Sequence, residues 1–92
     1  MQVAWTSLAA DDLTSICDFI RKDSPQAALR VARVVYEGVE ALQKFRARGW
    51  PGRVQGTREL VLTGLRYVAV YEIHNKGVVI LRVLHGGMRW PR

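Results

Sequence analysis

Apolar residues in the first half of the chain recur at intervals of three and four, which is the spacing of one face of an α-helix. The first stripe consists of Leu13, Ile16, Cys17 and Ile20. Ser7 is predicted to cap this helix, and Ser24-Pro25 begins a second one, with Ser as the N-cap and Pro in the first turn. The second helix is predicted to run to about Arg46. Its buried stripe consists of Ala28, Ala32, Val35, Val39, Leu42 and Phe45.

The second half of the chain is rich in Val, Ile and Tyr, and its pattern is typical of β-strands. The predicted strands cover residues 3–5, 58–62, 66–74 and 78–84, the first of them at an edge of the sheet. Asn75-Lys76-Gly77 is the tight turn between the last two strands. Alternation along the last strand places Arg82 and Leu84 on one face. The residues expected on the other face are Leu81, Val83 and His85.

These elements predict one α+β domain over residues 1–92, in which an N-terminal helical hairpin packs on a small antiparallel β-sheet. The 92 residues, 49% of them hydrophobic, are enough for one modest core. No apolar run approaches the roughly 20 residues that cross a bilayer. The N-terminus lacks the layout of a secretion signal, and the single Cys17 cannot form an internal disulfide. We therefore expect a cytoplasmic protein without membrane association.

The formal net charge of +6 is distributed unevenly along the chain. Residues 1–45 carry five Lys and Arg against six Asp and Glu, a balance of −1. Residues 46–92 carry nine against two, a balance of +7, and eight of those nine are arginine. The guanidinium group binds phosphate and carboxylate groups in a bidentate manner. This basic half is therefore expected to bind an acidic partner, either nucleic acid or protein.

Few residues have an arrangement that is typical of an active site. His74 and His85 lack the spacing of metal ligands, and there is no glycine-rich phosphate loop, so we expect neither a metal nor a cofactor. The polar candidates in the basic half are Arg53, Arg58, Arg66, Arg82, His85 and Arg89. In one interpretation, Arg58 and Arg82 hold a phosphate while His85 exchanges a proton. In the other, the arginines bind an acidic protein and His85 only caps the sheet through a backbone hydrogen bond.

Three sequence blocks of the basic half are specific enough to indicate a family. They are Gly56-Thr57-Arg58-Glu59-Leu60-Val61, Tyr67-Val68-Ala69-Val70-Tyr71 and Ile80-Leu81-Arg82-Val83-Leu84-His85-Gly86-Gly87-Met88-Arg89-Trp90. With these blocks the chain resembles the RelE/ParE toxins of bacterial type II toxin–antitoxin systems, over essentially its whole length. The resemblance implies the same hairpin-on-sheet fold. It also implies a hetero-oligomer with a cognate antitoxin, a partner that is typically acidic and wraps the toxin.

The resemblance leaves the target open. RelE-like members cleave mRNA on the ribosome without a metal, and in such a nuclease the expected catalytic residues are Arg58, Arg82 and His85. ParE-like members poison DNA gyrase through protein contacts. The tail Leu84-His85-Gly86-Gly87-Met88 is similar to ParE-like endings and favours gyrase. A degenerate member that binds only its antitoxin and DNA is a third hypothesis. The residues expected to bind the partner or nucleic acid are Arg53, Arg66, Met88, Arg89 and Trp90.

Overall fold

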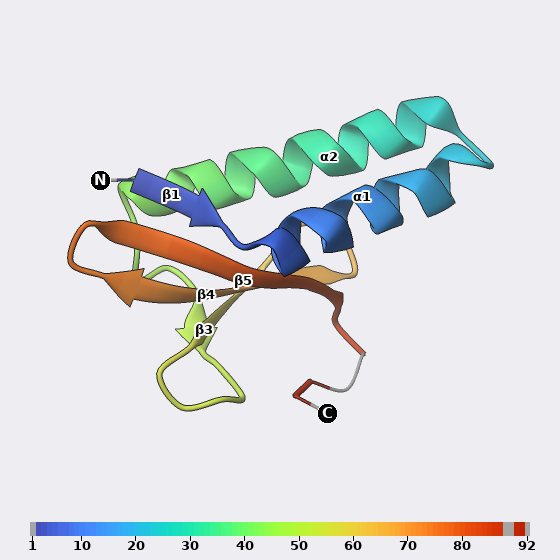
Figure 1. The fold of residues 1–92 in the computed structure, drawn as a ribbon. Helices are drawn as coiled ribbons and strands as arrows, with labels where there is room; N and C mark the ends of the chain where they lie inside the picture. The colour runs from blue at the N-terminus through green and yellow to red at the C-terminus, as the bar shows by residue number, and fades with distance from the viewer. Residues whose placement is uncertain (1, 88–89, 92) are drawn as a thin grey trace.

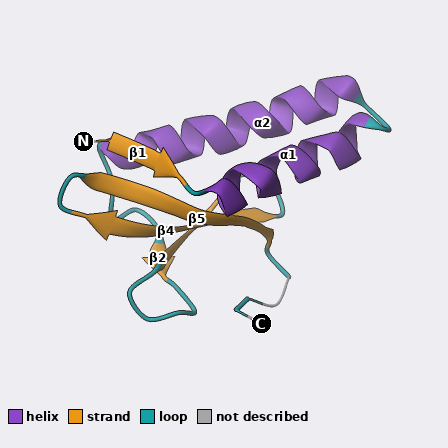
Figure 2. Cartoon of the chain, viewed as in Figure 1, coloured by secondary structure: helices purple, strands orange, loops and turns teal. Residues whose placement is uncertain are grey.

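The computed structural model describes residues 2–87, 90 and 91, and its helices form a layer over one face of a single sheet (Figure 1). The helical layer consists of α1 (Ser7–Arg21), α2 (Pro25–Glu40) and the 3₁₀ turn η1 (Ala41–Gln43). The sheet consists of β1 (Gln2–Trp5), β2 (Trp50–Pro51), β3 (Arg58–Val61), β4 (Tyr67–His74) and β5 (Gly77–His85). Figure 2 shows the hairpin on one side of the strands, with the loop before β3 and the C-terminal tail on the other. The predicted α+β fold is therefore confirmed.

The strands are ordered β1-β5-β4-β3-β2. The predicted antiparallel meander is formed by β3, β4 and β5, and β1 pairs in parallel with β5 at one edge. At the opposite edge, β2 pairs with β3 only through Trp50 with Glu59 and Pro51 with Arg58. The sequence does not predict β2, because a proline between glycines is typical of a loop.

Thr6 is the N-cap of α1, so the prediction that Ser7 caps this helix is wrong. The Thr6 backbone is still extended, and its N–H donates to the Ile80 carbonyl of β5 at 3.0 Å. Its hydroxyl accepts the Ala9 N–H at 3.1 Å. The helix begins at Ser7, one residue earlier than predicted, because the pairing with β5 ends at Thr6.

The second helix begins as predicted, since the Ser24 hydroxyl accepts the Ala27 N–H at 3.1 Å. It ends at Glu40 and tightens into η1, so the predicted continuation to Arg46 is wrong. The helical periodicity ends there as well, and Phe45, which was expected in the buried stripe, is 60% exposed. The stripe residues that the structure buries are Ala28, Val35, Val39 and Leu42.

The main core lies between the helices and the sheet. Its buried residues are Ala9, Val31, Val35, Val39, Leu42, Leu60, Leu62, Ala69, Tyr71, Val78, Ile80 and Val83. A smaller cluster on the other sheet face contains Val68, Val70 and Leu84, with Leu81 and Trp90 packed against it. Cys17 is buried in the hairpin, as predicted. Within the described residues, no helix is long and apolar enough to span a membrane.

A bulge in β5 changes which residues share a face. The register between β4 and β5 shifts at Val70 and Tyr71, which leaves Leu81 without an opposite residue in the described ladder. Leu81 therefore packs in the smaller cluster while Val83 packs in the main core. The prediction that these two residues lie on the same face is wrong, because it assumes uninterrupted alternation.

Candidate partner interface

Arg53 lies in the loop between β2 and β3 and binds Glu59 of β3. Its Nε is 3.0 Å from Oε2 of Glu59 and its Nη2 is 3.1 Å from Oε1, while its backbone N–H donates to Oε2 at 2.9 Å. The hydrogen bonds from Arg53 lower the pKa of Glu59, and the same contact raises the pKa of Arg53. The guanidinium that was expected to bind a partner is thus paired with a carboxylate of its own chain.

Arg58 and Tyr71 hold the loop that follows η1. Nη2 of Arg58 donates to the carbonyls of Ala47, at 2.9 Å, and of Gly49. The Tyr71 hydroxyl donates to the Arg46 carbonyl at 2.6 Å and accepts the Gly49 N–H at 2.9 Å. A Cβ at Gly49 would lie 2.8 Å from this hydroxyl, so only glycine fits there. Side chains of β3 and β4 therefore fix the backbone of this loop from inside the molecule.

Arg82 binds Asp12 of α1. Its Nε is 2.8 Å from Oδ2 of Asp12 and its Nη2 is 2.9 Å from Oδ1, and the Val83 N–H donates to Oδ2 at 2.9 Å. The contact with Asp12 raises the pKa of Arg82. Since β1 ends opposite Ile80, the Asp12 carboxylate replaces a strand partner along the next part of the β5 edge. Arg82 thus contributes to joining the helical layer to the sheet.

His85 is exposed at the end of β5 and contacts Tyr67 edge-on, with 5.8 Å between the ring centroids. Its Nδ1 accepts the Gly87 N–H at 3.2 Å, which is a contact of the kind expected if His85 only caps the sheet. Among the described contacts, no hydrogen bond joins this ring to Arg58 or Arg82.

The three residues expected to carry phosphate chemistry are not gathered in one place. Arg58 lies opposite Tyr71, whereas His85 lies opposite Tyr67, four residues away on β4 and with that strand between them. This register separates Arg58 from His85 by about 13 Å along the strands and about 10 Å across them. The described part of the chain also contains no group of three or more His, Cys, Asp or Glu that could hold a metal ion.

The remaining predicted contact residues lie near the end of β5. The Arg66 side chain is exposed, and the Arg66 carbonyl accepts the Gly86 N–H at 2.6 Å. Trp90, which was expected at an interface, is half-buried against the smaller apolar cluster of its own sheet. Met88 and Arg89 lie outside the described residues.

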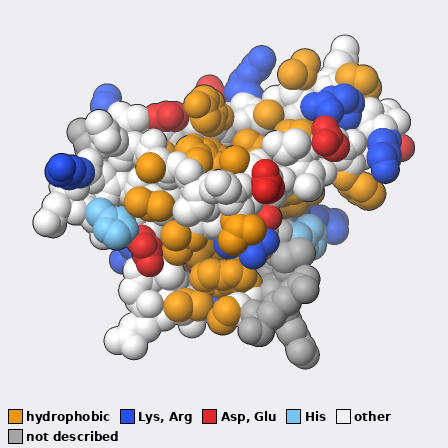
Figure 3. Space-filling view, in the orientation of Figure 1, with side chains coloured by type: hydrophobic (Ala, Val, Ile, Leu, Met, Phe, Trp, Pro, Cys, Tyr) orange, Lys and Arg blue, Asp and Glu red, His pale blue; other side chains and the backbone are white. Residues whose placement is uncertain are grey.

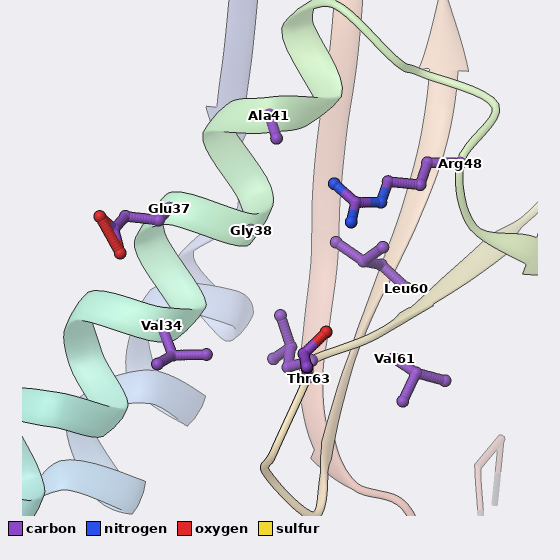
Figure 4. Close-up of a pocket in the computed structure, with 9 residues that line it drawn as sticks. Val34, Glu37, Gly38, Ala41, Arg48, Leu60, Val61 and Thr63 are labelled. Atoms are coloured by element: carbon purple, nitrogen blue, oxygen red, sulfur yellow. The ribbon is translucent and has the colours of Figure 1, made fainter.

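A groove of about 350 Å³ runs between α2 and β3 (Figure 4). The residues that line it are Val34, Glu37, Gly38, Ala41, Arg48, Leu60, Val61, Leu62 and Thr63. A Cβ at Gly38 would lie 3.0 Å from Cδ2 of Leu62, so the glycine allows α2 to lie this close to the end of β3. Figure 4 shows the Arg48 side chain extending from its loop toward α2. The groove therefore combines apolar and polar side chains, with an arginine at one end.

Several large apolar side chains are exposed on β3 and on the segments that precede it, and the sequence did not reveal them as a group. Phe45 is 60% exposed, Trp50 72% and Val61 58%, and a hollow of about 490 Å³ beside Phe45 shares Arg48 with the groove. Figure 3 shows further hydrophobic side chains along the middle of the face on which β1 lies. A sequence signal for the groove was Gly38, since a glycine inside a helix costs stability and often marks a close approach.

Comparisons with known proteins agree with one another. The family model described as "ParE toxin of type II toxin-antitoxin system, parDE" matches residues 3–90. The chain is 41% identical over 91 residues to "Putative toxin Y4kP" of Sinorhizobium fredii, covering 99% of this chain and 94% of the relative. It is 37% identical over 84 residues to "Toxin RelE2" of Caulobacter vibrioides, covering 91% and 93%. The fold matches a chain of "Chromosomal ParDE TA system from P. aeruginosa" with a TM-score of 0.82 and 32% identity, covering 92% and 95%.

Proposed function

Since the chain belongs to the ParE toxin family of type II toxin–antitoxin systems, we propose that it inhibits growth by binding DNA gyrase and that a cognate acidic antitoxin neutralises it. In this proposal the toxin acts through protein contacts and carries out no reaction of its own. The partner is expected to be acidic because the second half of the chain has a charge balance of +7.

The observation that carries the proposal is the internal use of the predicted arginines. Arg82 is bound by Asp12, and Arg58 is bound by loop carbonyls. A phosphate-cleaving site needs its cations and its proton-exchanging groups within reach of one substrate position. The separation of Arg58 from His85 along the sheet therefore supports a target that is bound rather than cleaved. A toxin that binds a protein target has no such requirement.

The second candidate function is that of a RelE-like, metal-independent mRNA endoribonuclease. The exposed ring of His85 beside Tyr67 favours it, because an accessible imidazole can exchange protons near neutral pH. The relative from Caulobacter vibrioides also bears the name RelE2. In such a nuclease, Arg58 and Arg82 have to exchange their present partners for RNA phosphates.

Two assays on the same purified toxin separate these candidates. One follows gyrase-catalysed supercoiling of a plasmid, and the other follows mRNA cleavage in a translating extract. We expect supercoiling to be inhibited, the inhibition to be reversed by the antitoxin, and the mRNA to stay intact. Cleavage of mRNA that disappears in His85→Ala contradicts the proposal. If neither effect occurs and growth is not slowed, the chain is instead a member that binds only its antitoxin and DNA.

A further inference from the structure

Residues 41–58 carry positive charge that no acidic residue of the segment offsets. The segment contains five Lys and Arg residues and neither Asp nor Glu. Two of the cations serve the fold, because Arg53 binds Glu59 and Arg58 binds loop carbonyls. The other three are exposed and, among the described contacts, form neither an ion pair nor a side-chain hydrogen bond; they are Lys44, Arg46 and Arg48. Three cations of one short loop are therefore available to a partner.

Two exposed aromatic side chains belong to the same loop. Phe45 lies between two of the cations in the sequence, and Trp50 follows Arg48 by two residues. Phe45 is 60% exposed and Trp50 is 72% exposed. The hollow beside Phe45 is lined by Phe45, Ala47 and Arg48, so an aromatic ring and a guanidinium group border one space. A base can stack on such a ring while its phosphate binds the neighbouring cation.

The backbone of this loop is fixed by hydrogen bonds within the chain. The N–H groups of Lys44 and Phe45 donate to the Ala41 carbonyl at 3.1 Å, and the Arg48 N–H donates to the Phe45 carbonyl at 3.0 Å. Side chains of β3 and β4 bind the backbone of residues 46–49. Because the loop is already ordered, a ligand that binds it causes little further loss of conformational entropy.

The combination of cations and rings favours an unpaired nucleic acid strand over other acidic partners. Each nucleotide carries one phosphate and one base, so consecutive nucleotides can contact both the cations and the rings of the loop. A duplex keeps its bases stacked on one another and presents mainly phosphates, which leaves Phe45 and Trp50 without a contact. An unpaired strand exposes the faces of its bases as well as its phosphates.

We propose that the loop of residues 44–50 binds an unpaired segment of nucleic acid. Its three free cations contact phosphates, and bases stack on Phe45 and Trp50. Binding depends little on base sequence, because every base has a face that can stack. The inference concerns binding without cleavage. It goes beyond the proposed function and does not depend on it, since none of these residues was assigned to contact with gyrase.

The salt dependence of binding tests the contribution of the cations. The full-length toxin is titrated into a labelled oligothymidylate, and fluorescence anisotropy gives the dissociation constant. Its logarithm is expected to rise with the logarithm of the salt concentration with a slope of about 2, because each phosphate contact on a single strand contributes about 0.7. Arg48→Ala is expected to lower the slope by about 0.7. Arg33→Ala is the matched control, because Arg33 is exposed on α2, and an equal decrease there would overturn the proposal.

Substitution of the aromatic residues tests the stacking of bases. We expect Phe45→Ala and Trp50→Ala each to weaken binding about tenfold, and Trp50→Phe to retain most of the affinity. Phe19→Ala is the control, because Phe19 is 70% exposed on α1, outside the loop, and we expect less than about a twofold change. Wild-type affinity in both alanine variants would overturn the proposal. Should Trp50→Ala fail to fold, Phe45→Ala decides.

Competitors separate unpaired nucleic acid from the other acidic ligands. Duplex DNA and polyglutamate, each matched to the oligothymidylate in number of charges, are expected to displace it poorly. Efficient displacement by the duplex or by polyglutamate would overturn the proposal, and in the second case the loop binds acidic protein. Comparison with an oligouridylate identifies the source, since the tighter of the two strands shows whether RNA or DNA is preferred. None of these results bears on the supercoiling assay, so this inference and the proposed function fail separately.

Discussion

Asp12 joins α1 to β5 through three hydrogen bonds, two from the Arg82 guanidinium and one from the Val83 N–H. The Asp12 side chain is 16% exposed and that of Arg82 is 28% exposed, so water can replace these bonds only in part. Removal of the carboxylate leaves a half-buried cation and a backbone N–H without their partner. At the residue scale, Asp12 therefore gives Arg82 a structural role, whereas the sequence analysis expected Arg82 to hold a phosphate.

Asp12→Ala is therefore expected to lower the free energy of unfolding by about 2–3 kcal/mol. Asp11→Ala is the control, because Asp11 is exposed on the same helix and its loss is expected to change stability by less than about 0.5 kcal/mol. Urea denaturation of the two variants measures the difference. Equal losses would show that the contacts of Asp12 with β5 add nothing to stability.

Glu59 gives the fold a pH dependence of definite sign. The hydrogen bonds from Arg53 lower its pKa below the ordinary value of 4.5, so the folded state favours the ionised carboxylate. The resulting stabilisation is complete above that ordinary value and is lost as the pH falls through the lower pKa of the folded state. We expect the stability of Glu59→Gln to decrease less than that of the wild type between about pH 5 and about pH 3. Parallel curves in acid denaturation would contradict this.

At the scale of the elements, local signals predicted the helices, and a contact with a distant strand determined where α1 begins. The spacing of apolar residues and the Ser24-Pro25 pair act within a few residues, so the hairpin could be read from the sequence. Thr6, by contrast, is the cap of α1 because β5 holds it extended. The bulge at Leu81 and the strand β2 also depend on neighbouring strands, and local patterns do not report them.

The same limit applies to the candidate site. The charge split predicted a basic half, but the carboxylates that bind Arg82 and Arg53 come from other elements, Asp12 from α1 and Glu59 from β3. Asp12 is 70 residues from Arg82 in sequence, so no local pattern connects them. The groove could not be predicted either, because α2 and β3 are separated in the sequence and meet only in the folded chain. Sequence reasoning therefore found the sign of the surface charge and missed which arginines are available.

Among the described glycines, Gly77 is the one at which an added side chain is expected to destabilise the fold most. Its φ is +156°, and a Cβ would lie 1.9 Å from the Gln2 carbonyl oxygen, so any side chain pushes β1 away from β5. We expect Gly77→Ala to lower the free energy of unfolding by about 2 kcal/mol or more. Gly87→Ala is the control, because the nearest atom to its Cβ is 3.6 Å away. Thermal unfolding of both variants checks this, and a similar melting temperature would contradict the tight packing of β1.

At the scale of the whole molecule, the structure separates arginines that stabilise the fold from arginines that can meet a partner. Arg53 and Arg82 are paired with acids of the chain, whereas Arg48 and Arg66 are exposed. Arg48 also lines both the groove beside α2 and the hollow beside Phe45. A molecule built in this way is suited to binding partners, and its membership in the ParE toxin family supports that use.

The most direct test of this account is growth after induction of His85→Ala in cells without the antitoxin. The account predicts the same growth arrest as with the wild-type toxin, because contact with gyrase requires no proton transfer by His85. Loss of growth arrest in a His85→Ala protein that still folds and still binds the antitoxin would contradict it. That result would identify His85 as part of a reaction and support an mRNA target.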